Sequence, residues 1–204
     1  MAEFKGKKVE DLIVAILLSD SHIRKNHRKN YEILFSLDKE KNYILHNYVI
    51  RNNIQDSISI KQIDDQKYVF ENNIMLERIV RDWTDGQRVT SINPQLLNTN
   101  VYTLLICLFA YKGKKDVIIH TNMAREAQAT VQFFIYELMG THLIPNGKVF
   151  KVRLLNKLVA KSIIEGRPYY ESMEIMSLLS DQEKHYFYDQ HHSFIEGNLS
   201  YANY

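Results

Sequence analysis

Hydrophobic residues in the first half of the chain follow two spacings, one helical and one strand-like. Residues 9–19 are apolar at nearly every position after Asp11, which predicts a buried helix. Residues 31–37 alternate well enough for a strand, and Asp38 then stands where a helix N-cap is expected. We therefore expect a helix over 9–19, strands over 22–25 and 31–37, a helix over 39–52, a hairpin over 57–71 and a helix over 73–83.

The second half repeats this order of elements roughly 90 residues later. Its clearest local signals are Asn146-Gly147, a typical two-residue hairpin turn, and Gly140, a typical helix stop. We expect a helix over 100–111, a strand over 116–121, a helix over 124–140, a hairpin over 142–155 and a helix over 156–164.

The repeated order predicts an α+β fold built as a tandem pseudo-twofold repeat of α-β-β-α-β-β-α. Residues 9–86 form the first expected unit and residues 94–175 the second, with Gly86 and Pro94 as breakers in the linker. A polar tail is expected over 176–204. Because the symmetry is internal, we expect a monomer.

Composition places the 204-residue chain among ordinary folded proteins, with 45% hydrophobic and 25% charged residues. The net charge is only +2, so nucleic-acid binding requires that the basic residues gather on one face. The single cysteine, Cys107, excludes an internal disulfide and fits a reducing compartment.

Targeting signals and membrane segments are not expected. No apolar run reaches the ~20 residues that span a bilayer, and the first twelve residues lack the apolar core of a secretory signal. Frequent Tyr, Asn, Ile and Lys residues are typical of an AT-rich genome such as an organelle's. On composition alone, we expect an intracellular protein, mitochondrial and organelle-encoded.

Three segments carry a resemblance to a known family. The first is "IVAILLSDS", residues 13–21, followed by "HIRKN". The others are "DVIIHTNMAREAQATVQFFIYELMG" and "NGKVFKVRLLNKLVAKSII" with "RPYYESM" after it. Together they resemble the LAGLIDADG homing endonucleases with two signatures in one chain, over about Val9 to Met173.

The resemblance implies an arrangement and an activity. Two signature helices would pack side by side, with small residues allowing close approach. The acid at the tip of each helix would help to hold Mg²⁺, which takes oxygen ligands and assists phosphodiester hydrolysis. Two sheets would carry the DNA contacts.

The signatures depart from the family pattern in this chain. In the first, Ala15, Ser19 and Ser21 replace the usual glycines, and Asp20 holds the position of the catalytic, metal-ligating acid. In the second, "LICLFAYKG" aligns Lys112 with the other acid. An ammonium group repels Mg²⁺, so we expect no second ligand and an ion pair between Lys112 and Asp20. Mg²⁺ is expected only if the nuclease is active.

The second sheet is also expected to be reduced. Only "GKK" separates the second signature helix from its next strand, so the first strand of that sheet should be very short or absent.

Two groups of basic residues are candidates for nucleic-acid contacts, because phosphate binding relies on Lys and Arg. Both groups could equally be ordinary solvent-exposed residues with no nucleic-acid contact. They are His22, Arg24, Lys25, His27, Arg28 and Lys29 in the first hairpin, and Lys148, Lys151 and Arg153 in the last.

Three functions from different classes remain open at this stage. We favour a nucleic-acid-binding protein that has lost DNA cleavage and acts on RNA or in a ribonucleoprotein, as a maturase-like protein or a ribosome-associated subunit. Its partners would be DNA or structured RNA, or a ribosome or another ribonucleoprotein. We expect no membrane partner. The alternatives are an active Mg²⁺-dependent homing endonuclease and a purely structural interaction subunit.

Overall fold

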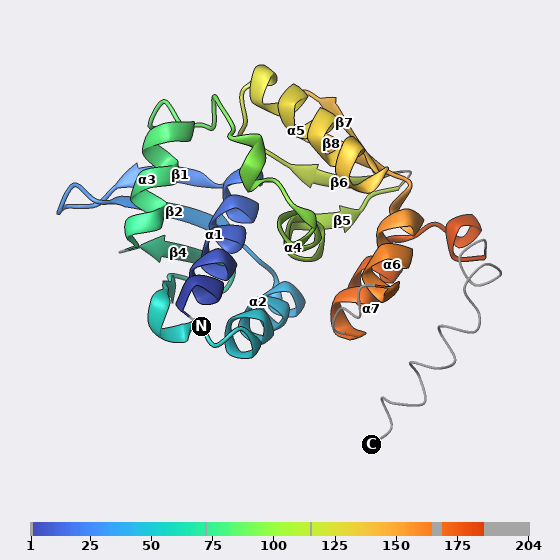
Figure 1. The fold of residues 1–204 in the computed structure, drawn as a ribbon, viewed down its shortest axis with the longest axis horizontal. Helices are drawn as coiled ribbons and strands as arrows, with labels where there is room; N and C mark the ends of the chain where they lie inside the picture. The colour runs from blue at the N-terminus through green and yellow to red at the C-terminus, as the bar shows by residue number, and fades with distance from the viewer. Residues whose placement is uncertain (1, 72, 115, 165–168, 186–204) are drawn as a thin grey trace.

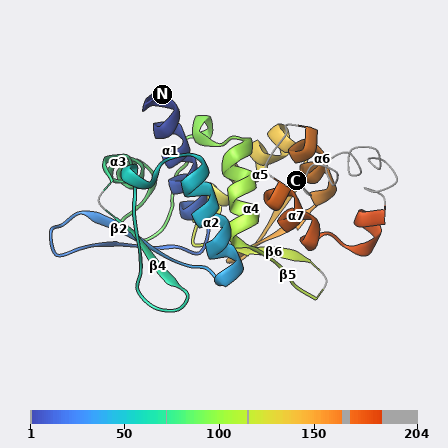
Figure 2. The same cartoon turned by 90° about the horizontal axis from the view of Figure 1, so that it is seen from below.

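Two four-stranded antiparallel sheets and a central group of helices make up the protein (Figure 1). The computed structural model describes residues 2–71, 73–114, 116–164 and 169–185. The helices lie on one side of the two sheets (Figure 2), so the other face of each sheet is open. The predicted α+β fold with two like units is confirmed.

The first unit contains three helices and four strands, in the order expected from the sequence. Its sheet has the strand order β1-β2-β4-β3. The elements are α1 (Ala2–Leu18), β1 (His22–Lys25), β2 (Tyr31–Ser36), α2 (Lys39–Arg51), β3 (Ser59–Gln62), β4 (Lys67–Glu71) and α3 (Ile74–Trp83), with the short helix η1 (Gln55–Ser57) before β3.

The second unit repeats this order and adds one helix. Its sheet has the equivalent strand order β5-β6-β8-β7. The elements are η2 (Pro94–Leu96), α4 (Thr99–Phe109), β5 (Ala110–Lys112), β6 (Val117–His120), α5 (Arg125–Met139), β7 (His142–Asn146), β8 (Val149–Arg153), α6 (Leu155–Ile164) and α7 (Tyr169–Leu178).

Local sequence chemistry sets several element ends. The Asp38 carboxylate accepts from the Lys41 backbone N–H at 2.8 Å and caps α2. Asn98 caps α4 in the same way, through the N–H groups of Asn100 and Val101. Gly140 ends α5 with φ 62°, a left-handed conformation that favours glycine.

Several element boundaries differ from the prediction, and two of these differences concern the helices α1 and α4. Helix α1 begins at Ala2 rather than Val9, because its polar first turns are supported by pairs such as Lys7–Glu10, 2.8 Å apart. The predicted helix over 100–111 ends at Phe109, since Ala110 and the next two residues pair with β6 instead. The first strand of the second sheet was predicted to be very short or absent, and β5 has three residues.

The two units meet along a seam between α1 and α4, which run side by side in Figure 2. Both helices are buried over most of their length. The seam admits polar groups at its ends: the fully buried Asp11 accepts from the Asn98 Nδ2 at 2.8 Å and the Asn100 Nδ2 at 3.2 Å. These bonds tie the first unit to the start of α4.

Helix α7 packs against α4 and β5, so the end of the described chain returns to the seam. Residues 186–204 of the predicted polar tail lie outside the described residues. Within the described part of the chain, no helix is both long and apolar enough to cross a bilayer.

Candidate functional site

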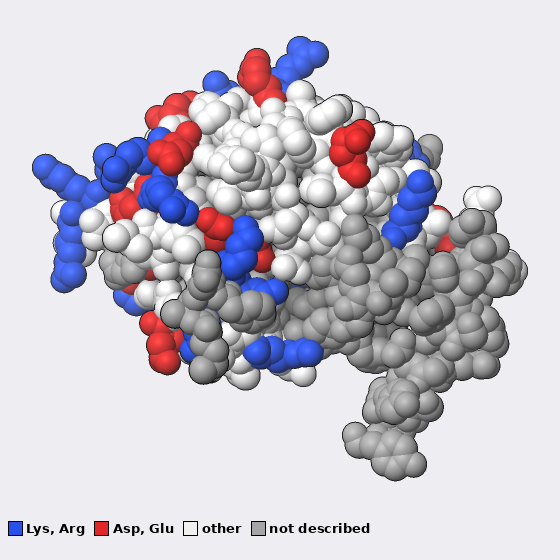
Figure 3. All heavy atoms as spheres, viewed as in Figure 1, with Lys and Arg blue, Asp and Glu red and all other residues white. Residues whose placement is uncertain are grey.

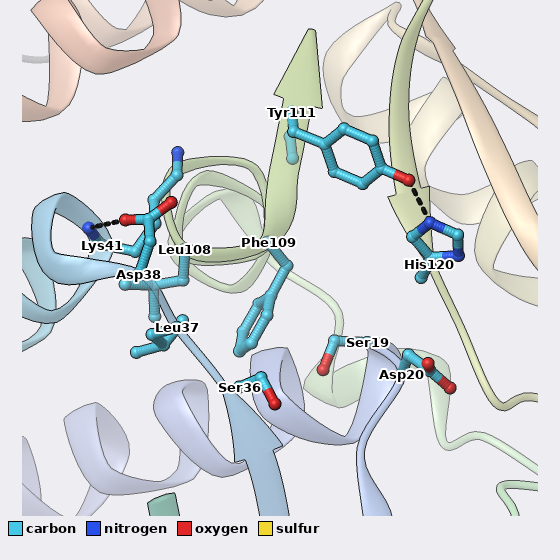
Figure 4. A pocket seen from close by; sticks show the side chains of 11 residues that line it. Ser19, Asp20, Ser36, Leu37, Asp38, Lys41, Leu108, Phe109, Tyr111 and His120 are labelled. Atoms are coloured by element: carbon cyan, nitrogen blue, oxygen red, sulfur yellow. Dashed lines mark hydrogen bonds between the residues drawn. The ribbon is translucent and has the colours of Figure 1, made fainter. Parts of the chain in front are cut away.

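A pocket of about 270 Å³ opens at the end of the seam where α1 and α4 finish (Figure 4). Both units contribute to it, through the ends of two helices, the start of a third and three strands. The lining residues are Ser19, Asp20, Ser36, Leu37, Asp38, Lys41, Leu108, Phe109, Ala110, Tyr111 and His120.

Asp20 lies in a loop of three residues between α1 and β1, and its side chain is exposed. Groups of the second unit hold this loop in place. The backbone N–H of Asn122 donates to the Ser19 carbonyl at 3.2 Å, and its side-chain amide donates to the Ser21 carbonyl at 3.4 Å. The carboxylate is therefore presented at the mouth of the pocket on a tethered loop.

The second unit has no such loop, because β5 begins directly after α4. Asp20 is the second residue after α1, and the second residue after α4 is Tyr111. Tyr111 lines the pocket with Asp20, whereas Lys112 does not. Counted from the helix ends, a phenol rather than an ammonium stands opposite the acid.

The predicted ion pair between Lys112 and Asp20 is wrong. The Lys112 Nζ donates to the backbone carbonyl of Leu179, 2.9 Å away, just beyond the end of α7. Successive side chains of a strand point to opposite faces, so Lys112 turns away from the side on which Tyr111 lies. Aligning the two signatures places Lys112 opposite Asp20, but Asp20 is the second residue after its helix and Lys112 the third. The difference arises because α4 ends one residue earlier in its signature than α1 does.

Tyr111 and His120 form a connected pair on neighbouring strands. The Tyr111 hydroxyl is hydrogen-bonded to the His120 Nε2, and the two ring planes are 14° apart with centroids at 5.3 Å. Burial raises the pKa of the Tyr111 phenol above its usual value, so the phenol stays protonated.

The opposite wall of the pocket comes from the start of α2. One Asp38 oxygen is engaged by the Lys41 N–H, and the Lys41 side chain turns away to an ion pair with Glu174 of α7. In Figure 4, Asp38 lies beside Leu37 and Lys41 on one side and Asp20 beside Ser19 on the other.

These donors do not fit the two-acid metal site implied by the resemblance. That site takes one carboxylate from the tip of each signature helix, and α4 supplies none. Asp38 belongs to the same unit as Asp20 and lies across the pocket. Among the described residues, no three His, Cys, Asp or Glu side chains are grouped closely enough to hold a metal ion.

The six basic residues predicted in the first hairpin are all exposed. Figure 3 shows Lys and Arg side chains gathered at the left edge, where the β1–β2 hairpin projects. Arg24 pairs with Glu32 at 3.0 Å, and Lys25 lies 4.8 Å from the centre of the Tyr31 ring. Arg28 and Lys29, at the tip, have no carboxylate partner among the described residues.

The three basic residues predicted in the last hairpin differ from one another. Lys148 is exposed in the β7–β8 turn. Lys151 and Arg153 both pair with Asp116, at 3.1 Å and 2.6 Å. Of the basic residues predicted in the two hairpins, more are left without a carboxylate partner among the described residues in the first hairpin than in the last, where only Lys148 is.

Acidic groups also occupy the open face of the first sheet. Glu71 is buried and ion-paired with Lys61, and Glu32 is buried beside Arg24. The hydrogen bond from Lys61 holds the pKa of the Glu71 carboxyl below its usual value. This face is internally neutralised, so phosphate attraction depends on the hairpin tip.

Sequence reasoning did not identify His120 or the role of Tyr111. The available signal was weak: each is a polar-tipped residue at an open-face position of a short strand. Their juxtaposition depends on the register in which Tyr111 pairs with Ile118, two residues before His120.

Solved structures with a similar fold are homing endonucleases, among others. The homing endonuclease I-WcaI, described as bound to its DNA recognition sequence, has a TM-score of 0.51 and 12% identity, covering 88% of this chain and 85% of its own. I-DmoI, in complex with DNA and Ca, has a TM-score of 0.45 and 12% identity, covering 78% and 88%. Full-length DUF199/WhiA from Thermatoga maritima has a TM-score of 0.47 and 12% identity, covering 98% and 73%.

Comparison with family models finds no match, and neither does comparison with curated proteins. At 12% identity, the likeness to I-WcaI concerns the fold. The chain therefore has the fold of the LAGLIDADG homing endonucleases, with one acid-bearing signature loop where two such loops would be expected.

Proposed function

We propose that this protein binds nucleic acid through the first hairpin and does not cleave it. The single observation that carries the proposal is the direct junction of α4 and β5, which removes the loop that would hold a second acid. A single exposed carboxylate binds Mg²⁺ more weakly than two carboxylates would, because its charge alone must offset the ion's lost hydration.

The basic hairpin supports the binding part of the proposal. It projects from the body of the protein and carries Arg28 and Lys29 free of carboxylate partners among the described residues. I-WcaI, which shares the fold, is bound to DNA in its structure. Phosphate contacts by unpaired Lys and Arg release counterions and give salt-dependent affinity.

A structured RNA, free or in a mitochondrial ribonucleoprotein, is the favoured class of target. A symmetric grip on a long DNA duplex requires two comparable sheets. Here β5 has three residues, and Lys151 and Arg153 are already paired with Asp116. One charged hairpin suits a local feature of a folded RNA better.

A structural interaction subunit is the second candidate, favoured by the outer surface of α5. Phe133, Tyr136 and Leu138 are exposed there, and no Lys or Arg occurs between Glu126 and Gly147. Figure 3 shows the corresponding surface as largely uncharged. Such a surface suits a protein partner and not a phosphate backbone.

Binding and cleavage can be tested together with duplex DNA and structured RNA in Mg²⁺ buffer. We expect salt-dependent retention of RNA and no cutting of either substrate. The double substitution Arg28→Ala, Lys29→Ala should weaken binding at least tenfold. It should also reduce the slope of log affinity against log salt concentration by roughly two, because two phosphate contacts are lost. Arg81→Ala with Lys39→Ala, two exposed basic residues elsewhere, is the matched control.

Site-specific DNA cutting that disappears in Asp20→Asn would overturn the proposal and restore the endonuclease. Absence of any binding, with recovery of a protein partner from mitochondrial extract, would favour the structural subunit. Recovery of one RNA or of ribosomal particles from the same extract would support the favoured class.

A further inference from the structure

We propose that the seam pocket binds a single unstacked nucleobase, so that the target is a nucleic acid with an unpaired nucleotide. This inference rests on the proposed function and names the feature of the target that the pocket recognises. Three properties of the pocket support it: an aromatic wall, two carboxylates beside a lysine that is already ion-paired with Glu174, and its place between the two sheets.

The aromatic wall consists of Phe109, Tyr111 and His120. Tyr111 is 39% exposed, so its ring is available to a ligand although it is already fixed by the bond to His120. Two nearly parallel rings held by a hydrogen bond form a pre-organised surface. Nucleobases stack on such aromatic side chains regardless of sequence, since every base has a π-face.

The polar groups favour a base over a phosphate. Asp20 and Asp38 line the pocket from opposite sides, and among the described residues the one lining lysine or arginine, Lys41, is ion-paired with Glu174. Phosphate would therefore meet uncompensated negative charge. An exocyclic amino group, in contrast, donates to a carboxylate, as the cytosine N4 group does in protein complexes.

The pocket lies at the end of the seam, where both β2 and β6 end at its rim. A nucleic acid held by the first hairpin and crossing the open faces of the sheets would pass this opening. Bases of a continuous duplex are stacked and cannot enter a pocket, whereas unpaired or flipped nucleotides can. The pocket thus selects loops and bulges, and bases with an exocyclic amino group over uracil, which has none.

The test uses an RNA hairpin with one bulged 2-aminopurine, whose fluorescence falls on stacking, and the same hairpin fully paired. We expect about tenfold tighter binding of the bulged RNA, in line with the 1–3 kcal/mol of a base–aromatic stack, and quenching on binding. Tyr111→Ala should remove the preference and the quenching. Tyr111→Phe should keep most of both, which separates stacking from loss of fold.

Tyr43→Ala, which removes an exposed tyrosine on α2, is the matched control and should change neither quantity. A DNA hairpin with the same bulge distinguishes the two sources of the base. Equal binding of bulged and paired hairpins that still depends on Arg28 and Lys29 overturns the base pocket and leaves the proposed function standing. No binding of any hairpin overturns both.

Discussion

Asp11 illustrates how single polar residues fix the relation of the two units. Its carboxylate is fully buried, yet it accepts from two side-chain amides at the start of α4 and lies 3.6 Å from the Lys7 Nζ. A buried carboxylate is stable only when its oxygens are satisfied in this way. Both donors come from the start of α4, so the contact ties α1 to α4.

Removing this carboxylate should destabilise the protein. Asp11→Ala leaves the Asn98 and Asn100 amides facing a small void, and each lost buried bond costs about 1–3 kcal/mol. Urea unfolding followed by circular dichroism measures the change. Asp56→Ala, an exposed acid in η1, should alter stability by less than about 0.5 kcal/mol. Equal losses in the two variants would contradict the role of Asp11.

The Glu71 carboxyl should make stability fall at acidic pH. Its pKa is depressed in the folded protein, chiefly by the hydrogen bond from Lys61. Its contribution is therefore complete above the unfolded pKa of about 4.3 and is lost as pH falls through the lower folded value. Lys61→Ala should move the acid-unfolding midpoint to higher pH. An unchanged midpoint, with Lys67→Ala as the exposed control, would show that the pair does not matter.

Helix and strand ends decide the character of the pocket at the level of elements. Helix α1 stops two residues before Asp20 and leaves a loop, whereas α4 passes directly into β5. The pairing of Ala110 with Ile119 begins that strand at once. As a consequence, the two halves of a symmetric scaffold present an acid on one side and an aromatic pair on the other.

Two glycines should respond to alanine in opposite directions. Gly140 has φ 62° at the end of α5, and an added Cβ would lie 3.4 Å from the Lys157 Cδ, so Gly140→Ala should cost about 1 kcal/mol. Gly6 lies within α1, where its Cβ would meet only Met75 Cε at 3.9 Å. Gly6→Ala should stabilise by roughly 0.5–1 kcal/mol. Thermal melting of both variants checks the sign, and a shared sign would contradict this reading.

On the scale of the molecule, helix α7 closes back on the seam and joins the units. Lys41 of α2 pairs with Glu174 of α7, and Lys112 of β5 donates to the Leu179 carbonyl. Both lysines contact the C-terminal segment, one from each unit. This helix therefore stabilises the relative placement of the sheets and also keeps Lys41 from neutralising the pocket.

Breaking the Lys41–Glu174 pair should be costly because the Lys41 and Glu174 side chains are only 10% and 18% exposed. Glu174→Gln should lower the free energy of unfolding by on the order of 3 kcal/mol, since it leaves a mostly buried ammonium unpaired. Asp181→Asn, in the exposed pair with Lys184, should cost less than about 1 kcal/mol. A double-mutant cycle with Lys41→Met isolates the pair, and a coupling near zero would contradict this account.

The repeated order of elements and most of their ends could be predicted from local sequence patterns. Periodicity, caps and turn residues are local properties, so Asp38, Gly140 and the Asn146-Gly147 turn could be recognised without any tertiary contact. The apolar helix before Asp20 could also be predicted, because a helix buried on all sides has an uninterrupted apolar run in its sequence.

The residues that face Asp20, and the pairing of the basic residues in the last hairpin, depend on tertiary contacts. The register of β5 on β6 places Tyr111 beside His120 and turns Lys112 toward Leu179, which no local pattern encodes. Asp116 neutralises Lys151 and Arg153 across strands that are far apart in sequence. Both outcomes depend on side chains meeting in space, whereas a linear pattern records only their spacing along the chain.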